Sequence, residues 1–513
     1  MERSQEVIMA KVLFAQEIYF PFQSTARLSA SLKKAGHRVS LAIGDEQKIV
    51  TTIKKEKPDL IAFSVLTPYR NHMLLCANAI KRAGIKTPVI AGGYDITFLP
   101  QILAHSDLDI ICMGEGEAPL HDLCRCIDNH EDYRHIANLW VKEGGVIFKN
   151  RMRQWVMNMD ELPFDDRDLY FDYDSYFKII PFTQVLVGRG CPYPCSYCFN
   201  DGYRKLYKEA GSSGYCNLRS VDNLMAELKI LKAKYNARYI FFNDSTLTYN
   251  KKWLFEFLTK YKAEIGIPFS LNAVITEIDE DVGKALKENG WCELVRFGLE
   301  TGNEEFRKTV LRKNISNQQL INGTGILKKN NIRYSMAMML GLPGETLDLC
   351  WETLLMAKKI SAKDSVHAIN IFKPFPGLDI TDYGIKIGQY KRDDIASHEL
   401  PESLKRERGQ NPAPLADNFQ NLALGTRDLC FFENYRIDKE GQLLLKLSRF
   451  SHLAIRFSFL RPLIRLLVKL PDNFAFRFIW KSTEAFLNIR AHANVPLSFF
   501  VKYFLFHRGK KIR

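Results

Sequence analysis

Short apolar segments of the kind that form buried β-strands recur between residues 11 and 372, and helical stretches with apolar residues at three- and four-residue spacing separate most of them. Strands that alternate with helices build parallel sheets, because each helix returns the chain to the edge at which the previous strand began. This alternation places the chain in the α/β class. Ligands of such sheets bind at the carboxyl ends of the strands, so the residues that follow each strand are the first candidates for a site.

The first unit is expected over residues 1–140. Its predicted strands are KVLFAQ (11–16), RVSLAI (38–43), LIAFSVL (60–66), PVIAGG (88–93) and LDIICMG (108–114). Segments with the apolar spacing of helices, such as TARLSASLKKAG, lie between them. This pattern predicts a doubly wound parallel sheet with helices on both faces.

A second α/β unit is expected over residues 183–390. Its predicted strands are TQVLVG (183–188), ARYIFF (237–242), FSLNAV (269–274), LVRFGL (294–299), YSMAMML (334–340) and HAINIF (367–372). Strands in this number with helical crossovers indicate a partial (β/α)6 barrel. NDS, ETG and GLPGET follow the second, fourth and fifth of these strands. We therefore expect these polar and glycine-bearing segments at one end of the barrel.

The rest of the chain has less pattern. Residues 141–182 are expected to be a linker, acidic and aromatic in ELPFDDRDLYFDYDSYF, with its acidic run in solvent. Residues 391–513 are expected to form a basic, mostly helical region. The composition, 46% hydrophobic and 25% charged, is that of a globular protein. Neither a signal-peptide pattern nor an apolar run of about 18 residues is present, which favours a cytoplasmic protein.

Three cysteines lie within eight positions in GRGCPYPCSYCFN (188–200). A cytosolic location argues against disulfides, and a tetrahedral zinc site would need a fourth ligand, for which no second CxxC or HxxxH lies nearby. Thiolates from Cys191, Cys195 and Cys198 suit a 4Fe-4S cluster with one iron left open. Gly188 and Gly190 would let the backbone turn tightly around it. The alternative is three unrelated buried cysteines.

CPYPCSYC resembles the CxxxCxxC signature of radical S-adenosylmethionine (radical SAM) enzymes, including the aromatic Tyr197 before the third cysteine. The resemblance implies that Cys191, Cys195 and Cys198 hold a 4Fe-4S cluster whose open iron binds the amino and carboxylate groups of SAM. An electron from the cluster then cleaves SAM to methionine and a 5'-deoxyadenosyl radical. By the same resemblance, the SAM-binding residues are Tyr197, Asn243, Asp244, Asn272, Glu300, Gly341 and Gly344. Without the cysteines, Asp244 could equally cap a helix, Glu300 could be a solvated turn residue, and Asn272 could be a hydrogen-bonded polar residue of the barrel.

The first unit resembles the Rossmann-like cobalamin-binding (B12-binding) fold, in the version that is fused to radical SAM enzymes, through its SxL, AGGYDITFLP and MGEGEAPL segments. The resemblance implies cobalamin contacts from Ser64, Leu66, Gly92, Gly93, Tyr94, Gly114, Glu115, Gly116 and Glu117. The DxHxxG loop that supplies a cobalt-binding histidine in the mutase branch is missing, and His37 is expected at the surface. A domain that keeps the fold without the cofactor is the alternative.

Together the resemblances imply a cobalamin-dependent radical SAM methyltransferase that acts on an unactivated carbon. The deoxyadenosyl radical would abstract hydrogen, methylcobalamin would deliver the methyl group, and a second SAM would restore methylcobalamin. Tyr193, Tyr197, Phe199 and Tyr383 are candidate pocket aromatics. The expected partners are a small-molecule or lipid-like substrate and a flavodoxin- or ferredoxin-type reductant. A non-methylating reaction, such as cyclisation or C–C coupling, and a nucleic-acid-binding or RNA-modifying protein remain alternatives, although no RNA-binding motif appears.

Residues 441–513 hold 14 Lys and Arg against 2 Asp and Glu, which leaves +12 of the chain's net charge of +14. The same segment is rich in Leu and Phe, as in FSFLRPLIRLLVKL. It is too charged to span a bilayer but suits a membrane interface, where basic residues meet anionic lipid. A helical cap on the barrel explains the pattern equally well, and binding to a phosphate backbone is a third interpretation.

Overall fold

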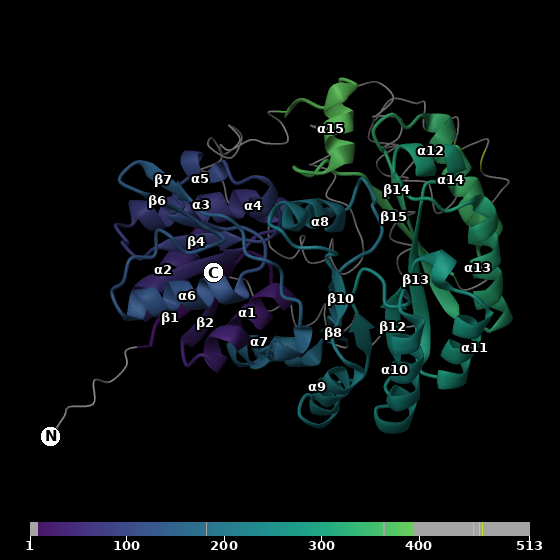
Figure 1. The fold of residues 1–513 in the computed structure, drawn as a ribbon, viewed down its shortest axis with the longest axis horizontal. Helices are drawn as coiled ribbons and strands as arrows, with labels where there is room; N and C mark the ends of the chain where they lie inside the picture. Colours follow the sequence, from purple (N-terminus) through teal and green to yellow (C-terminus); the bar gives the residue numbers. More distant parts are fainter. Residues whose placement is uncertain are drawn as a thin grey trace.

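The structure is a computed structural model, and it describes residues 9–180, 182–362 and 365–392 together with Ile455, Arg461 and Ile464. Two α/β units lie side by side, the N-terminal sheet on the left of Figure 1 and the barrel on the right. The predicted α/β class and the order of its two sheets along the chain are confirmed.

The N-terminal sheet is doubly wound, as the sequence predicts. Its strand order is β2-β1-β3-β4-β5-β6-β7, and the first five of these strands are parallel. One apolar cluster lies on each face of the sheet. The strands are β1 (Lys11–Gln16), β2 (Arg38–Ile43), β3 (Leu60–Ser64), β4 (Val89–Gly92) and β5 (Ile110–Cys112), and the helices are α1 (Gln23–Lys34), α2 (Glu46–Glu56), α3 (Arg70–Arg82), α4 (Tyr94–Phe98), α5 (Ile102–His105) and α6 (Glu117–Asp128).

An antiparallel hairpin extends this sheet into the region that the sequence suggests as linker. β6 (Leu139–Glu143) pairs with β5, and β7 (Val146–Lys149) pairs with β6. Gly144 and Gly145 form the turn with φ values of +58° and +80°. Two glycines between apolar segments are a hairpin signal, so this feature was present in the sequence.

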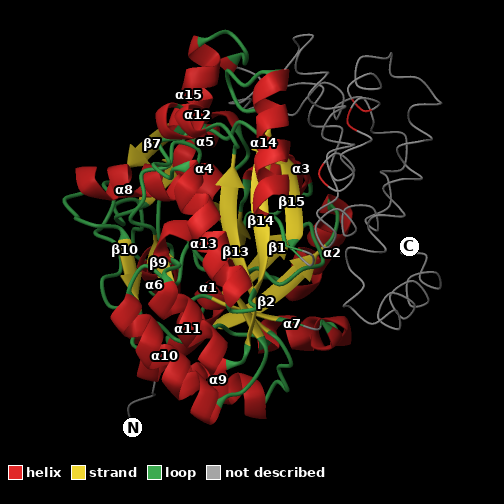
Figure 2. Ribbon diagram, turned by 90° about the vertical axis from the view of Figure 1, so that its right-hand side faces the viewer, coloured by secondary structure: helices red, strands yellow, loops and turns green. Residues whose placement is uncertain are grey.

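The second sheet is a partial barrel. Its parallel strands lie in the order β15-β14-β13-β12-β11-β8, and the edge strands β15 and β8 do not pair with each other. Helices cover its outer face (Figures 1 and 2). The strands are β8 (Thr183–Val185), β11 (Ile240–Phe242), β12 (Phe269–Asn272), β13 (Cys292–Glu300), β14 (Arg333–Leu340) and β15 (Val366–Ile371), and the helices with α8 (Phe199–Glu209) are α9 (Val221–Ala233), α10 (Lys251–Glu264), α11 (Glu280–Asn289), α12 (Glu304–Thr309), α13 (Asn317–Lys329), α14 (Leu347–Ile360) and α15 (Asp379–Lys386).

Side chains alternate along the barrel strands. On β14, Tyr334, Met336 and Met338 are buried in the core under the helices, so the residues between them face the inside of the barrel. The helices begin and end on local signals as well: the side chain of Asp279 accepts a hydrogen bond from the N–H of Val282 at the start of α11.

The segment predicted as the first barrel strand is broken in two. After β8 the chain leaves the sheet, and β9 (Gly188–Gly190) pairs instead with β10 (Cys216–Leu218) in an antiparallel ribbon. The carboxylate of Asp244 accepts hydrogen bonds from the N–H groups of Val187 and Gly188, at 3.0 and 2.6 Å. A side chain thus replaces the strand partner that these two N–H groups lose.

Two expectations about exposure are wrong. His37 is buried, and its Nδ1 lies 3.3 Å from Oδ2 of Asp128. The acidic linker run is not wholly in solvent, since Asp165 is buried in an ion pair with Arg27 at 2.8 Å. The linker therefore docks on α1 instead of running freely between the units.

The basic region at 441–513 lies outside the described residues except for three positions. Ile455 and Ile464 are helical and belong to the barrel core. The helical form predicted for the remainder, and its membrane contact, stay predictions. Across the described part of the chain, every helix is too short or too polar to cross a bilayer.

Candidate functional site

The three predicted cluster cysteines lie on one loop between β9 and α8, beside the N-terminal unit. Gly190 has a φ of +81° directly before Cys191, and both Gly188 and Gly190 also make room for β10. A Cβ on Gly190 would lie 1.8 Å from the carbonyl oxygen of Tyr215, and one on Gly188 would lie 2.1 Å from that of Asn217. Glycine is therefore needed at both positions for the ribbon that holds the loop.

The thiols of Cys191, Cys195 and Cys198 converge. Burial, together with the charge of neighbouring cysteines, raises the pKa of Cys191 to about 12 and that of Cys198 to about 11. The thiols would have to lose their protons to bind iron. In the described ranges, no three His, Cys, Asp or Glu side chains are arranged around a single ion. A 4Fe-4S cluster takes each thiolate on a different iron, so converging thiols with soft sulfur donors fit that group.

A fourth cysteine lies at the loop and was not singled out from the sequence. Cys216 pairs with Gly190 across the β9–β10 ribbon, next to Cys191. Its thiol also forms a hydrogen bond with the Tyr249 hydroxyl, although burial dominates and raises the pKa of Cys216. Only the antiparallel pairing of two strands far apart in sequence brings it there.

Glu300 and Tyr197, both predicted SAM contacts, meet next to the loop. The Tyr197 hydroxyl donates to Oε1 of Glu300 at 3.0 Å. Lys313 joins them: its Nζ lies 3.0 Å from the same oxygen and 3.3 Å from the Tyr197 hydroxyl. Glu300 is buried and has a φ of +62°, a strained conformation for a residue other than glycine. Lys313, in a loop with no pattern of its own, was missed from the sequence.

Asn243, Asp244 and Asn272 lie together at the ends of β11 and β12. The Nδ2 of Asn272 donates to the carbonyl of Asp244 at 2.6 Å, and that of Asn243 lies 3.3 Å from Oε1 of Gln23 in the N-terminal unit. Burial raises the pKa of the Asp244 carboxyl to about 6, against the opposing effect of the Val187 and Gly188 N–H groups. This carboxylate already accepts hydrogen bonds from Val187 and Gly188 at the start of β9, so its contact with SAM stays a prediction.

Gly341 and Gly344 form the turn after β14, with φ values of +82° and +78°. Glu345 closes this turn, since its Oε2 accepts from the N–H groups of Gly341 and Leu342 at 2.7 and 3.1 Å. Tyr383 lies against Gly344, where an added Cβ would be 3.2 Å from the tyrosine hydroxyl. The turn lies at the carboxyl end of the barrel, where the hydrogen bonds of Glu345 and the contact with Tyr383 fix its position.

In the N-terminal unit, the SxL and GG segments fit against each other. The N–H of Val65 donates to the carbonyl of Gly92 at 2.8 Å. Gly93 has a φ of +106°, and a Cβ there would lie 2.6 Å from the Val65 carbonyl oxygen. The hydroxyl of Ser64 lies 2.8 Å from that of Ser24 on α1. The absence of a side chain at Gly93 therefore makes room first for the protein's own backbone at Val65.

Leu66 and Tyr94 stand out at the same strand ends, because they are large apolar residues that are 39% and 40% exposed. Burial nevertheless raises the pKa of the Tyr94 hydroxyl, and Cys198 raises it further. The Tyr94 ring also lies 5.1 Å from that of Phe199, so Tyr94 stands beside the loop of the three cysteines. Exposed apolar surface beside the loop fits a large planar macrocycle such as the corrin of cobalamin.

The Gly114–Glu117 segment holds the two units together. The guanidinium of Arg189 on β9 pairs with Glu115 at 2.6 Å and, more closely, with Glu117. Burial alone would raise the pKa of Glu117, but the charge of Arg189 lowers it below its ordinary value. A Cβ on Gly114 would lie 2.6 Å from the Tyr207 hydroxyl, and one on Gly116 would lie 3.2 Å from Leu28.

Aromatic rings complete this junction. Phe199, directly after the third cysteine, lies 5.1 Å from Tyr94 and 5.3 Å from Phe98 between ring centres. Tyr203 packs against the same two rings at 5.3 and 5.2 Å. Figure 1 shows the two helices concerned, α4 and α8, side by side. Tyr193 lies elsewhere, with its hydroxyl 2.8 Å from Glu277.

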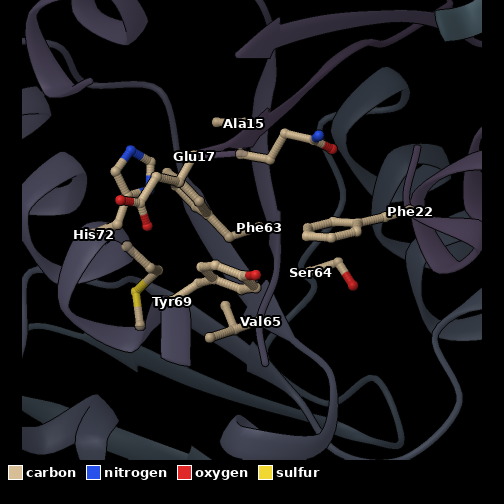
Figure 3. Close-up of a pocket in the computed structure, with 10 residues that line it drawn as sticks. Ala15, Glu17, Phe22, Phe63, Ser64, Val65, Tyr69 and His72 are labelled. Atoms are coloured by element: carbon tan, nitrogen blue, oxygen red, sulfur yellow. The ribbon is translucent and has the colours of Figure 1, made fainter. Parts of the chain in front are cut away.

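A small pocket lies beside the ends of β1 and β3. Phe22, Ser64, Tyr69 and His72 surround it, as Figure 3 shows. Its cavity volume is about 10 Å³, which is room for about one water molecule and far below the 300–1,000 Å³ of ordinary ligand pockets. It does not by itself hold a cofactor of the size of cobalamin.

Comparison with known proteins agrees with this geometry. Residues 185–357 match the radical SAM superfamily, and residues 25–124 match the B12 binding domain. An uncharacterised methyltransferase of Pyrococcus horikoshii is 28% identical over 69% of this chain and 77% of its own length. An anaerobic magnesium-protoporphyrin IX monomethyl ester cyclase of Rubrivivax gelatinosus is 23% identical over 65% of this chain, a match that spans only 60% of the cyclase.

Two solved structures share the fold of both units. The radical SAM methyltransferase TsrM from Kitasatospora setae, with cobalamin and a [4Fe-4S] cluster bound, has a TM-score of 0.60 at 14% identity, over 95% of this chain and all of its own. The cobalamin-dependent SAM radical enzyme OxsB has a TM-score of 0.60 at 17% identity, over 98% of this chain and 73% of its own. The predicted arrangement of a parallel N-terminal sheet before a radical SAM barrel is confirmed.

Proposed function

We propose that this radical SAM protein, whose barrel follows a B12-binding domain, is a cobalamin-dependent methyltransferase that transfers a methyl group from SAM to an unactivated carbon of a small molecule. The similarity to the methyltransferase of Pyrococcus horikoshii supports methyl transfer. The substrate itself is not specified by these similarities.

One structural observation carries the proposal. The cluster loop of the barrel and the strand ends of the B12-binding domain belong to the same junction. Tyr94 after β4 lies 5.1 Å from Phe199, which directly follows Cys198, and Arg189 of the cluster strand pairs with Glu115 and Glu117. The residues assigned to the two cofactors therefore lie at one junction, as a reaction that uses both would require.

When bound, the cluster with SAM would supply a carbon-centred radical, and cobalamin would supply a methyl group. The three cysteines would hold the cluster, and Gly92 and Gly93, with Tyr94 beside them, would line the cobalamin site at the slot for its nucleotide tail. Glu300, which pairs with Lys313 at 3.0 Å, would accept hydrogen bonds from hydroxyl groups of SAM. Phe199 and Tyr203, which pack against Tyr94, would help to exclude water from the junction.

Ring formation is the second candidate function. The similarity to the anaerobic cyclase of Rubrivivax gelatinosus favours it. In that reaction the substrate radical would form a new bond within the substrate, and no methyl group would be transferred. A hopanoid C-3 methylase of Methylococcus capsulatus is 25% identical over 33% of this chain, which supports an apolar, lipid-like substrate for either reaction.

Labelled SAM distinguishes the two reactions. Anaerobically reconstituted protein with cobalamin, a low-potential reductant and cell extract should transfer label from methyl-labelled SAM to an organic product and form 5'-deoxyadenosine. The Cys195→Ala protein serves as the control and should do neither. Formation of 5'-deoxyadenosine without transfer of label would reject methyl transfer and favour ring formation.

We further propose a flavodoxin- or ferredoxin-type protein as the electron donor and peripheral contact of the basic segment 441–513 with membranes. The excess of 14 basic over 2 acidic side chains supports that contact. The full chain should sediment with anionic liposomes at low salt, and a chain ending near residue 440 should not. Equal sedimentation of the two proteins would reject the membrane contact.

A further inference from the structure

Arg296 on the inner face of the barrel has no carboxylate partner in the part of the chain that the structure describes. It lies in the middle of β13, on the face opposite Val295 and Phe297, which are buried under the helices. Its Cζ lies 3.3 Å from the centre of the Phe241 ring, and its Nη2 donates to the carbonyl of Phe242 at 3.1 Å. Its Nε is buried and has no hydrogen-bond partner within the described ranges.

A second arginine of the barrel, Arg307, shows a structural role by contrast. It is fully buried, and its guanidinium donates to the carbonyls of Thr301, Gly302 and Ile315. Burial lowers the pKa of both side chains, to about 10 for Arg307 and about 9 for Arg296. Arg296 is largely buried and offsets its loss of hydration with a single hydrogen bond to a carbonyl and the contact with Phe241. Its other donors are free to bind a ligand.

The surroundings of Arg296 suit an anion. The register places it beside Asn272 on β12 and Ser335 on β14, which offer polar side chains on the same face of the sheet. The guanidinium lies over the Phe241 ring, with Cζ 3.3 Å from the ring centre, and Nη2 makes the hydrogen bond to the carbonyl of Phe242. A planar guanidinium binds carboxylate or phosphate through two parallel N–H groups.

Aromatic rings connect this place with the β8 edge of the barrel. Phe241 packs edge-on against Phe182, with 6.4 Å between ring centres. Phe182 directly precedes the edge strand β8 and is 36% exposed. A molecule that enters past this edge would meet an aromatic wall first and the positive charge of Arg296 behind it.

The carboxylate of SAM has a different cation available. It would bind the open iron, beside the three thiols. Lys313 lies there, with its Nζ 3.3 Å from the hydroxyl of Tyr197, which directly precedes Cys198. Burial raises the pKa of Cys195, and the Lys313 ammonium opposes that rise. Arg296 is instead tied to the backbone of β11.

We propose that Arg296 forms an anion subsite inside the barrel that binds a carboxylate or phosphate group of the substrate. The assignment to the substrate rests on the proposed function, whereas the anion subsite rests on the geometry of the barrel alone. Glu300 lies four residues farther along β13, at the carboxyl end where SAM is expected. The subsite would thus hold the substrate by its charged end and direct a remote, uncharged carbon toward the cofactors.

Thermal unfolding of the reconstituted holoprotein in inorganic phosphate tests the subsite. We compare the wild-type chain with Arg296→Met and Arg296→Lys in sodium phosphate and in sodium chloride of equal ionic strength. Phosphate should raise the midpoint of the wild-type chain by about 2 °C or more, that of Arg296→Lys by less, and that of Arg296→Met not at all. The same phosphate response in the wild-type chain and Arg296→Met would overturn the subsite, and so would the lack of any response in the wild-type chain.

The variants also separate a ligand-binding arginine from a structural one. Arg296→Met should unfold in chloride at or above the wild-type midpoint, because it removes a buried charge that has no carboxylate partner. Arg307→Met, the matched control, should unfold at a lower temperature, because it removes a fully bonded guanidinium. A loss of stability in Arg296→Met as large as that in Arg307→Met would assign Arg296 a structural role.

Binding of SAM distinguishes the source of the anion. In equilibrium dialysis with the holoprotein, Arg296→Met should bind methyl-labelled SAM within about twofold of the wild-type affinity. At least tenfold weaker binding, about 1.4 kcal/mol, would assign Arg296 to the carboxylate of SAM and overturn the substrate assignment. If methyl transfer fails while the phosphate response persists, the proposed function is wrong and the anion subsite stands.

Discussion

The Nη1 of Arg189 lies 2.6 Å from Oε1 of Glu115, across the junction of the two units. Arg189 is two residues before Cys191, and Glu115 follows the last parallel strand of the B12-binding domain. The backbone N–H of Glu115 also donates a hydrogen bond to the Tyr207 hydroxyl at 2.9 Å. The position of the cysteine loop relative to the N-terminal unit is therefore fixed by a largely buried ion pair and not only by apolar packing.

Replacing Arg189 should damage stability and cofactor binding together. Arg189→Met leaves the carboxylates of Glu115 and Glu117 buried without their cation, which should lower the free energy of unfolding by about 3–5 kcal/mol. Cobalamin affinity should fall as well, measured by visible absorbance during titration. Lys229→Met, which breaks an exposed ion pair with Glu264, should cost about 1 kcal/mol or less. Similar losses in both variants would contradict the role of the buried pair.

Iron binding should separate the cluster cysteines from their neighbour. Reconstituted wild-type protein should contain about four iron atoms per chain, and Cys195→Ala should lose most of them. Cys216→Ala is the matched control, because Cys216 lies beside Cys191 yet outside the CxxxCxxC loop. It should keep the iron and the near-ultraviolet and visible absorbance of the cluster. Loss of iron in Cys216→Ala would show that the fourth cysteine is a ligand.

Gly93 should tolerate no side chain. Gly93→Ala would place a Cβ 2.6 Å from the Val65 carbonyl oxygen at a φ of +106°, so the contact between the SxL and GG segments must open. We expect a loss of about 2 kcal/mol or more in urea unfolding, and weaker cobalamin binding. Gly84→Ala has a positive φ but open space around the Cβ, so it should cost only about 1 kcal/mol. Equal effects would mean that backbone strain alone accounts for Gly93.

The fold was largely predictable because it rests on local patterns. The bounds of β1 and β2 agree with KVLFAQ and RVSLAI, residue for residue. β9 was not separated from β8, because the break depends on Asp244, which lies 56 residues beyond Gly188 in the chain. The spacing of apolar residues gives no sign that the Asp244 carboxylate, and not a neighbouring strand, accepts these hydrogen bonds.

The site was predictable where a motif is continuous in the sequence. Cys191, Cys195 and Cys198 share one loop, and their spacing alone indicates a cluster. Arg189 and Lys313 carry no such pattern, since each is one basic residue among many. Their importance appears only when the fold places them beside Glu115 and Glu300.

The carboxyl group of Asp244 should make stability depend on pH. Burial raises its pKa from 3.8 to about 6, although the N–H groups of Val187 and Gly188 oppose the rise. Because the folded pKa lies above the unfolded one, the folded state binds the proton more tightly. The stability that this proton provides is complete below pH 3.8 and is lost as the pH rises through about 6. The full effect is about 3 kcal/mol, of which about 1 kcal/mol falls between pH 5 and pH 7.

Asp244→Asn should remove this dependence, because an amide does not ionise and its oxygen can still accept from both N–H groups. Urea unfolding at pH 5, 6 and 7 measures it. The difference in free energy of unfolding, wild type minus variant, should fall by about 1 kcal/mol from pH 5 to pH 7. Parallel pH profiles would show that the Asp244 carboxylate is ionised throughout this range, held by its hydrogen bonds with the cluster strand. In that case an ionised Asp244 carboxylate, and not a protonated carboxyl group, would hold the start of β9.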